Sequence, residues 1–202
     1  TTHLKTSFWA NEYDIAGYYQ LYETPFSTYS KFLKMALDHR LTPVMITDKH
    51  AHKSREYPFK VYLEPDGKTY SFDFSKVERF LHFVFCENPM KGNSINVAEH
   101  HYILGISIDV IQKPSGRRVE KTFLPFTQEY EDYLIQYIKA YLDMLSKNNW
   151  LDKAYINVVD EPVADSNRYD YSTIEWLHNI IRRNFPDLKI VSAVHDESVL
   201  KR

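Results

Sequence analysis

The chain has 202 residues, of which 44% are hydrophobic and 26% charged, a composition typical of a globular protein with one sizeable core. Its 25 basic and 27 acidic residues leave a net charge of −2 without a basic stripe, so we expect no nucleic-acid partner. The single cysteine, Cys86, excludes an internal disulfide framework, and no apolar run is long enough to span a membrane. The chain begins at Thr1 without a signal peptide, which suggests a processed or excised piece.

The first part of the chain is predicted to alternate strands with helices. Residues 4–9 form the first predicted strand, and residues 28–40 follow with the apolar spacing of a helix. A second strand is predicted over residues 41–46. A short helix over residues 76–81 then leads into a third strand over residues 83–86.

Two segments are predicted to be excursions from this framework. Residues 50–68 contain two prolines and end in a Pro-Asp-Gly-Lys turn signature. Residues 93–118 include a strand-like stretch and a Pro-Ser-Gly turn, which indicates a β excursion rather than a core element.

The second part of the chain gives the strongest patterns. Residues 127–145 carry apolar side chains at intervals of three and four, with Thr127 as a plausible N-cap. A strand rich in β-branched residues follows over residues 154–159, then a helix over residues 172–184 and a strand over residues 188–194.

Alternation of this kind predicts a parallel α/β sheet with right-handed crossovers. We expect a TIM-type (β/α) barrel formed by residues 1–202 as one catalytic domain. About five core strands are predicted where a complete barrel has eight, so the barrel would be incomplete at its C-terminal side. An open doubly wound sheet would also fit, although the glycine-rich nucleotide fingerprints are absent from the sequence.

The strand over residues 154–159 stops abruptly at Asp160, Glu161 and Pro162. The proline cannot donate to a continuing ladder, so the two carboxylates would lie at the C-terminal end of the strand. In α/β barrels this end of the strands carries the chemistry. The alternative interpretation is a strand followed by a solvated acidic turn.

Five segments of the sequence resemble the catalytic domain of glycoside hydrolase family 123, and related domains of unassigned function share the pattern. The most specific is the Trp-Leu-Asp-Lys run at residues 150–153, together with the strand that ends in Asp-Glu-Pro. The remaining segments are residues 8–9, 37–43, 70–76 and 185–190.

The resemblance implies a (β/α)8 barrel and an activity like that of β-N-acetylgalactosaminidases, acting on a glycan or glycoconjugate without a cofactor. It also implies a retaining mechanism in which the 2-acetamido oxygen of the substrate attacks the anomeric carbon and forms an oxazolinium intermediate. The matching acid pair is Asp160 and Glu161. Such a role would suit an exported protein, which is an expectation from the resemblance alone.

Physical reasoning assigns different roles to the two acids. Neighbouring residues of an ideal strand point to opposite faces, so Asp160 and Glu161 would not flank a glycosidic bond in the usual manner. One acid would instead serve the leaving group and the other the acetamide. Glu161 would be the general acid and then the base, whereas Asp160 would stay ionised and orient the acetamido N–H.

Three further residues are candidates for sugar binding. Trp9, at a strand end, could stack on a sugar ring, although packing under the barrel rim is nearly as plausible. His195 and Asp196 could bind sugar hydroxyls from the end of the last strand, or lie in a solvated loop. Asn157 is interpreted as a polar group in the barrel interior, and Tyr155 as a packing residue.

Two alternatives from other functional classes stay open. The first is a non-catalytic barrel fragment that binds sugar or protein, whose unclosed edge would favour self-association or a missing C-terminal part. The second is a metal hydrolase, because His50 and His52 have the spacing of zinc ligands and His100 or His101 could add another. The flanking Lys49, Lys53 and Arg55 disfavour a cation there, so we expect no metal.

Overall fold

The computed structural model describes residues 6, 8–10, 15, 18, 26–45, 59–97, 106–159 and 171–192. The chain divides into two compact units. The first comprises residues 1–59 and 74–95, and the second comprises residues 60–73 and 96–202.

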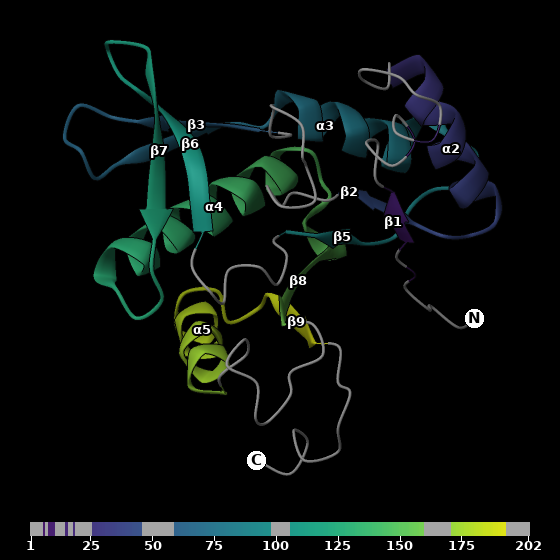
Figure 1. Cartoon of the computed structure of the whole chain (residues 1–202). Helices are drawn as coiled ribbons and strands as arrows, with labels where there is room; N and C mark the ends of the chain where they lie inside the picture. Colours follow the sequence, from purple (N-terminus) through teal and green to yellow (C-terminus); the bar gives the residue numbers. More distant parts are fainter. Residues whose placement is uncertain are drawn as a thin grey trace. The chain divides into compact units, whose positions relative to one another are not determined.

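Among its described residues, the first unit contains a small parallel sheet and the helices α2 and α3 (Figure 1). Strand β1 (Phe8–Ala10) pairs in parallel with β2 (Pro43–Met45), and helix α2 (Phe26–Asp38) lies between them in the sequence. The end of α2 is closed by Arg40 at φ 61°, which allows the Leu41 N–H to donate to the Ala36 carbonyl. This tight stop lets β2 begin immediately after the helix.

The expected third strand is wrong, because residues 83–86 are helical. Helix α3 (Ser75–His82) continues without a break into a π-helical turn, η1 (Phe83–Glu87). A short apolar run cannot by itself distinguish a strand from a buried helix, and here the periodicity decides. The buried side chains follow the i, i+3, i+4, i+7 spacing of one helix face: Val77, Phe80, Leu81, Val84 and Phe85.

The second unit contains a mixed four-stranded sheet in the order β4-β3-β6-β7. Strands β3 (Lys60–Leu63) and β4 (Tyr70–Asp73) form one antiparallel hairpin. Strands β6 (Ile106–Gln112) and β7 (Arg117–Phe123) form another, and β3 pairs with β6 in parallel. Gly67 and Gly116, both at φ 71°, supply the left-handed backbone that these two turns require.

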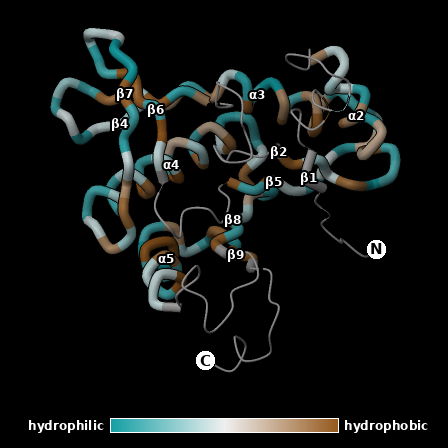
Figure 2. Tube along the Cα trace, in the orientation of Figure 1, coloured by the Kyte–Doolittle hydropathy of each residue, from teal (hydrophilic) through white to brown (hydrophobic). Residues whose placement is uncertain are grey.

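One face of this mixed sheet is covered by helix α4 (Gln128–Lys147), which runs beside the strands in Figure 1. The helix begins as predicted, with the Thr127 hydroxyl accepting a hydrogen bond from the Tyr130 N–H at 3.3 Å. Hydrophobic and hydrophilic bands alternate along its trace in Figure 2, as an amphipathic helix requires. The contact with the sheet is aromatic: Tyr133 packs against Tyr70, Phe72 and Phe123.

A three-stranded sheet has the order β5-β8-β9, and from Asn96 onward its residues belong to the second unit. Its strands are β5 (Ile95–Asn96), β8 (Ala154–Val159) and β9 (Lys189–Ser192), and β8 is parallel to β9. Helix α5 (Tyr171–Asn184) connects β8 to β9 and contacts β8. A 3-10 turn, Leu151–Lys153, leads from the end of α4 into β8.

The expected incomplete TIM-type barrel is wrong. The described strands lie in three separate sheets of two, four and three strands, and none of these sheets is closed. A barrel of this type needs one continuous parallel ladder, whereas both excursions form hairpins with short turns that force antiparallel pairing. The segments treated as departures from the fold therefore build its largest described sheet.

Candidate functional site

The candidate site lies where strands β8 and β9 end. These strands are parallel, and Val159 of β8 stands opposite Ser192 of β9 at the carboxyl edge of their sheet. The predicted acids Asp160 and Glu161 follow Val159 directly in the sequence, and His195 and Asp196 follow Ser192 after two residues. All four lie outside the described residues. For Trp9 the structure describes the backbone, which pairs with Val44 in the first unit.

Strand β8 is irregular just before it reaches the acid pair. Asn157 stands opposite Val191 and Val159 stands opposite Ser192, so β8 advances by two residues where β9 advances by one. This register shift leaves Val158 without a register partner in β9, which is the pattern of a β-bulge. A bulge interrupts the strict alternation of side chains, and bulges are frequent beside active sites, where they re-aim a side chain. The opposite-face argument for an ideal strand therefore does not apply unchanged at the end of β8.

The two faces of β8 differ in burial. Ala154, Ile156 and Val158 are all buried, on the side that packs in the core with α5. Tyr155 and Asn157 alternate with them and are half-buried. Val191, the register partner of Asn157, is 49% exposed, so this second face is the more open one.

Buried hydrogen bonds fix the position of β8. The Asn96 side-chain oxygen accepts from the Asn157 N–H at 3.1 Å, and the Val97 N–H donates to the Tyr155 carbonyl at 2.8 Å. The Tyr137 hydroxyl of α4 in turn donates to the Val97 carbonyl at 2.8 Å. Each such bond contributes about 1 kcal/mol to stability. Together they join helix α4, strand β5 and strand β8 into one rigid support.

The side-chain oxygen of Asn157 is buried and has no hydrogen-bond partner among the described residues. Leaving a buried acceptor unpaired costs about 1–3 kcal/mol, so such groups are rare in folded proteins. The barrel interior expected for this residue does not exist. Its side chain instead projects from the more open face of the three-stranded sheet.

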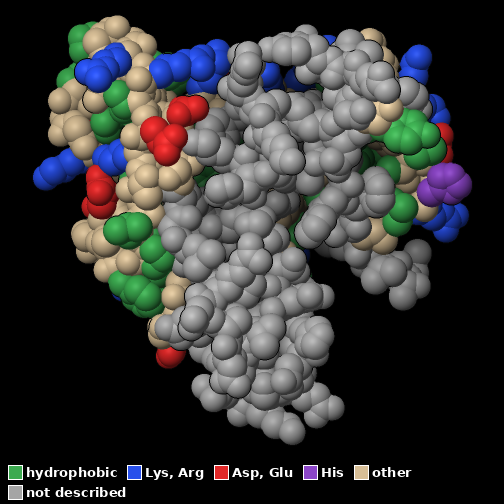
Figure 3. Space-filling view, viewed as in Figure 1, with side chains coloured by type: hydrophobic (Ala, Val, Ile, Leu, Met, Phe, Trp, Pro, Cys, Tyr) green, Lys and Arg blue, Asp and Glu red, His purple; other side chains and the backbone are tan. Residues whose placement is uncertain are grey.

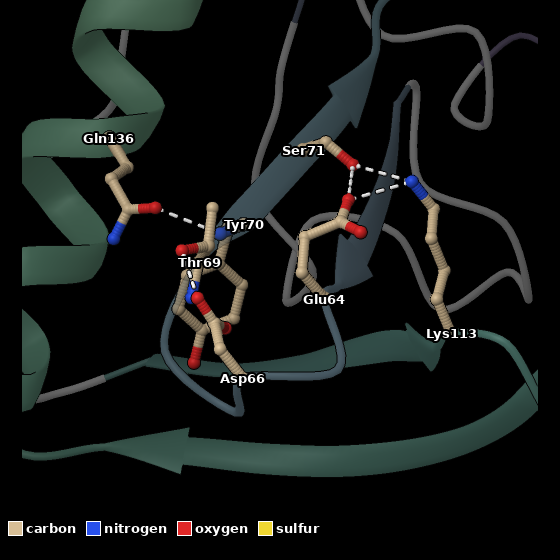
Figure 4. A network of polar contacts seen from close by, with 7 residues as sticks. All are labelled: Glu64, Asp66, Thr69, Tyr70, Ser71, Lys113 and Gln136. Atoms are coloured by element: carbon tan, nitrogen blue, oxygen red, sulfur yellow. Dashed lines mark hydrogen bonds and ion pairs between the residues drawn. The ribbon is translucent and has the colours of Figure 1, made fainter.

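A second polar cluster lies on the mixed sheet and is drawn in Figure 4. Glu64 accepts hydrogen bonds at 2.7 Å from both Lys113 and Ser71, and the Lys113 bond is the main reason that its pKa is lowered. Hydrogen bonds, above all from the Thr69 side chain, lower the pKa of Asp66 to about 2. Carboxyls held ionised in this way cannot act as general acids at neutral pH. The hydrogen bonds of this cluster stabilise the β3–β4 turn.

Other classes of site receive no support from the described residues. Within them, no three His, Cys, Asp or Glu side chains gather in a group that could hold a metal ion. His50, His52, His100 and His101, on which the metal hypothesis rests, lie outside this part of the chain. No helix among the described residues is long and apolar enough to cross a membrane. Acidic and basic side chains are interspersed over the mixed sheet in Figure 3.

Comparison with solved structures identifies a protein of the same fold. A family 123 glycoside hydrolase from Clostridium perfringens, studied for glycolipid glycan hydrolysis, superposes with a TM-score of 0.69 at 16% sequence identity. The match covers 98% of this chain and 37% of that enzyme, so the chain spans about a third of its length. No curated protein matches the chain.

Comparison with protein families gives the decisive result. Residues 9–202 match the family described as glycoside hydrolase 123, catalytic domain. The match includes Trp9, the acid pair after β8 and the residues after β9. It agrees with the resemblance found in the sequence segments. The chain therefore belongs to the glycoside hydrolase 123 catalytic domain family.

Proposed function

We propose that residues 1–202 act as a catalytic unit of a glycosidase that removes terminal β-linked N-acetylhexosamine, with N-acetylgalactosamine as the preferred sugar. The observation that carries the proposal is the family match over residues 9–202. It is supported by strand β8, which leads directly to Asp160 and Glu161 at an edge where β8 and β9 both end.

In the proposed mechanism the substrate supplies its own nucleophile. The acetamido oxygen attacks the anomeric carbon while Glu161 donates a proton to the leaving oxygen, which breaks the glycosidic bond and gives an oxazolinium ion. Asp160 stays ionised, accepts a hydrogen bond from the acetamido N–H and stabilises the positive charge. Glu161, now a base, takes a proton from the water that attacks the anomeric carbon, so configuration is retained.

The bulge in β8 supports this use of two adjacent acids. In a regular strand consecutive side chains point to opposite faces, which would separate the two carboxyls. Bulges bend a strand and increase its twist. The register shift in β8 lies immediately before the pair. We propose that this irregularity directs Asp160 and Glu161 to one substrate, with His195 and Asp196 contacting the sugar. The sugar-stacking role of Trp9, which belongs to the first unit, stays a prediction from the sequence.

The test compares two chromogenic substrates that differ only at C2. The purified chain is expected to hydrolyse 4-nitrophenyl N-acetyl-β-D-galactosaminide and not the corresponding β-D-galactoside. Glu161→Gln should lower kcat by about 100-fold to 10,000-fold on substrates whose leaving group needs protonation. The matched control is Glu175→Gln on the exposed surface of α5, which should leave kcat unchanged.

Each result discriminates between mechanisms. Equal hydrolysis of both substrates would remove the acetamido nucleophile from the mechanism. A Glu161→Gln variant that is fully active on an N-acetyl-β-D-galactosaminide with an alkyl or sugar leaving group would contradict the assigned role of that acid. Loss of activity with a chelator would favour the metal hydrolase. Sugar binding without any turnover would instead identify a non-catalytic carbohydrate-binding unit.

A further inference from the structure

Three buried side-chain polar atoms lack a hydrogen-bond partner among the described residues: Tyr70 Oη, His178 Nε2 and Asn157 Oδ1. Tyr70 lies in the aromatic contact between the mixed sheet and α4, where the Lys121 ammonium sits 5.3 Å from its ring centre. His178 lies on α5. Only Asn157 stands on a strand that leads to the proposed acid pair.

Other asparagines of the described chain have partners for their side chains. The amides of Asn88, Asn148 and Asn184 each donate to a backbone carbonyl of a preceding turn. The Asn96 oxygen accepts the Asn157 N–H. The Asn157 N–H therefore has a partner, whereas the Asn157 side-chain oxygen has none among the described residues. No described residue uses this oxygen as a hydrogen-bond acceptor.

The position of Asn157 suits contact with a bound molecule. Asn157 is half-buried and stands in register with Val191, which is 49% exposed, although the Asn157 side-chain oxygen is itself buried. It precedes the bulge at Val158 by one residue and Asp160 by three. An amide oxygen is an uncharged acceptor, so the missing partner must be an O–H or N–H group.

We propose that Asn157 is a substrate-binding residue whose side-chain oxygen accepts a hydrogen bond from a hydroxyl or amide N–H of the bound N-acetylhexosamine. Asn96 is a positioning residue that holds the backbone of Asn157 in place. The inference rests on the proposed function for the identity of the sugar. It does not depend on whether the bound sugar is turned over.

The test uses two variants of the same residue type. Asn157→Leu removes an oxygen that no described residue uses. The melting temperature should therefore stay unchanged or rise, while kcat/KM falls by about 10-fold to 100-fold. Asn96→Leu removes an oxygen that the fold does use, so the melting temperature should fall by several degrees, roughly 2–4 °C per kcal/mol lost. Asn157→Asp keeps an acceptor and should bind sugar better than Asn157→Leu.

A binding measurement separates this inference from the proposed activity. Free N-acetylgalactosamine should raise the melting temperature of the unmodified chain and not that of Asn157→Leu. That result supports the inference even where no substrate is hydrolysed. Equal stabilisation of both proteins, or a melting temperature of Asn157→Leu as low as that of Asn96→Leu, would overturn it while leaving the hydrolase proposal standing. A chain that neither binds nor hydrolyses the sugar would overturn both.

Discussion

The two sheets of the second unit use their side chains differently. The mixed sheet buries an aromatic face under α4, and several of its polar side chains pair with one another, as in the 2.7 Å contact between Ser107 and Thr122. The buried Tyr70 hydroxyl has no hydrogen-bond partner among the described residues. The three-stranded sheet is buried on one side and keeps Val191 half exposed on the other. It also contains the bulge and the unpaired Asn157 oxygen. The described registers of the mixed sheet are regular, whereas the three-stranded sheet combines a register shift with an unpaired side-chain oxygen.

This contrast shows where the chain can tolerate imperfect structure. Strained or unpaired groups persist when the surrounding structure holds them, and they cluster at functional sites. Here the holding structure is the set of buried bonds from Tyr137 and Asn96 to β5 and β8. Helix α4 contacts both sheets, because it covers a face of the mixed sheet and its Tyr137 hydroxyl donates to the Val97 carbonyl next to β5.

The largest expected effect on stability comes from the aromatic face. Tyr133 is 1% exposed, and its ring stacks on Phe123 at 4.4 Å between ring centres. Tyr133→Ala should lower the free energy of unfolding by about 3–5 kcal/mol, because the cavity removes aromatic contacts to both β4 and β7. Chemical denaturation would measure it, with Leu124→Ala, at a side chain 57% exposed, as the control. Similar losses in both variants would contradict the assignment of this face as the main core.

An intermediate effect is expected where α4 anchors the second sheet. Tyr137→Phe removes only the hydroxyl that donates to the Val97 carbonyl. The free energy of unfolding should fall by about 1–3 kcal/mol, because the Val97 carbonyl then lacks this donor. Amide hydrogen exchange would show faster opening of β5 and β8 than of β6 and β7. Uniform acceleration in all four strands would mean that the bond supports the whole unit and not the second sheet alone.

The smallest expected effect depends on pH and involves α5. Burial, and to a lesser extent the charge of Arg182, lowers the pKa of His178 from its ordinary value of 6.5. His178 therefore binds a proton more readily in the unfolded chain than in the folded one. The contribution of neutral His178 to stability is complete above its unfolded pKa and is lost as the pH falls through its folded pKa. His178→Leu should therefore lose less stability than the unmodified chain between about pH 7 and 5. Parallel stability curves for the two proteins would contradict a buried neutral histidine.

The sequence predicts those parts of the fold that depend on local patterns. The apolar stripe and Thr127 cap of α4 are confirmed, as are the strand over residues 154–159 and the helix that follows it. The same periodicity, extended from Val77 to Phe85, would have corrected the strand expected at residues 83–86. The pairing of β3 with β6 joins segments far apart in the chain, and no local signal specifies it.

The candidate site also combines features that the local sequence predicts with features that it does not. The acid pair is recognisable in the sequence because an apolar strand stops at two carboxylates, and the roles of Asp160 and Glu161 stay predictions. The bulge at Val158 depends on the register between two strands. The contact from Asn96 to Asn157 spans 61 residues. Both features arise from tertiary pairing, so no spacing rule could have identified Asn157 as more than an interior polar residue.

The route of the chain between its two units limits how the protein can be divided. The backbone passes from the first unit to the second after Phe59, returns at Phe74 and passes again after Ile95. Phe59 and Phe74 meet at the base of the hairpin, with ring centres 5.6 Å apart. No single cleavage can therefore release either unit as an intact fragment. During synthesis, the hairpin must wait for β6 to emerge before its place in the mixed sheet exists.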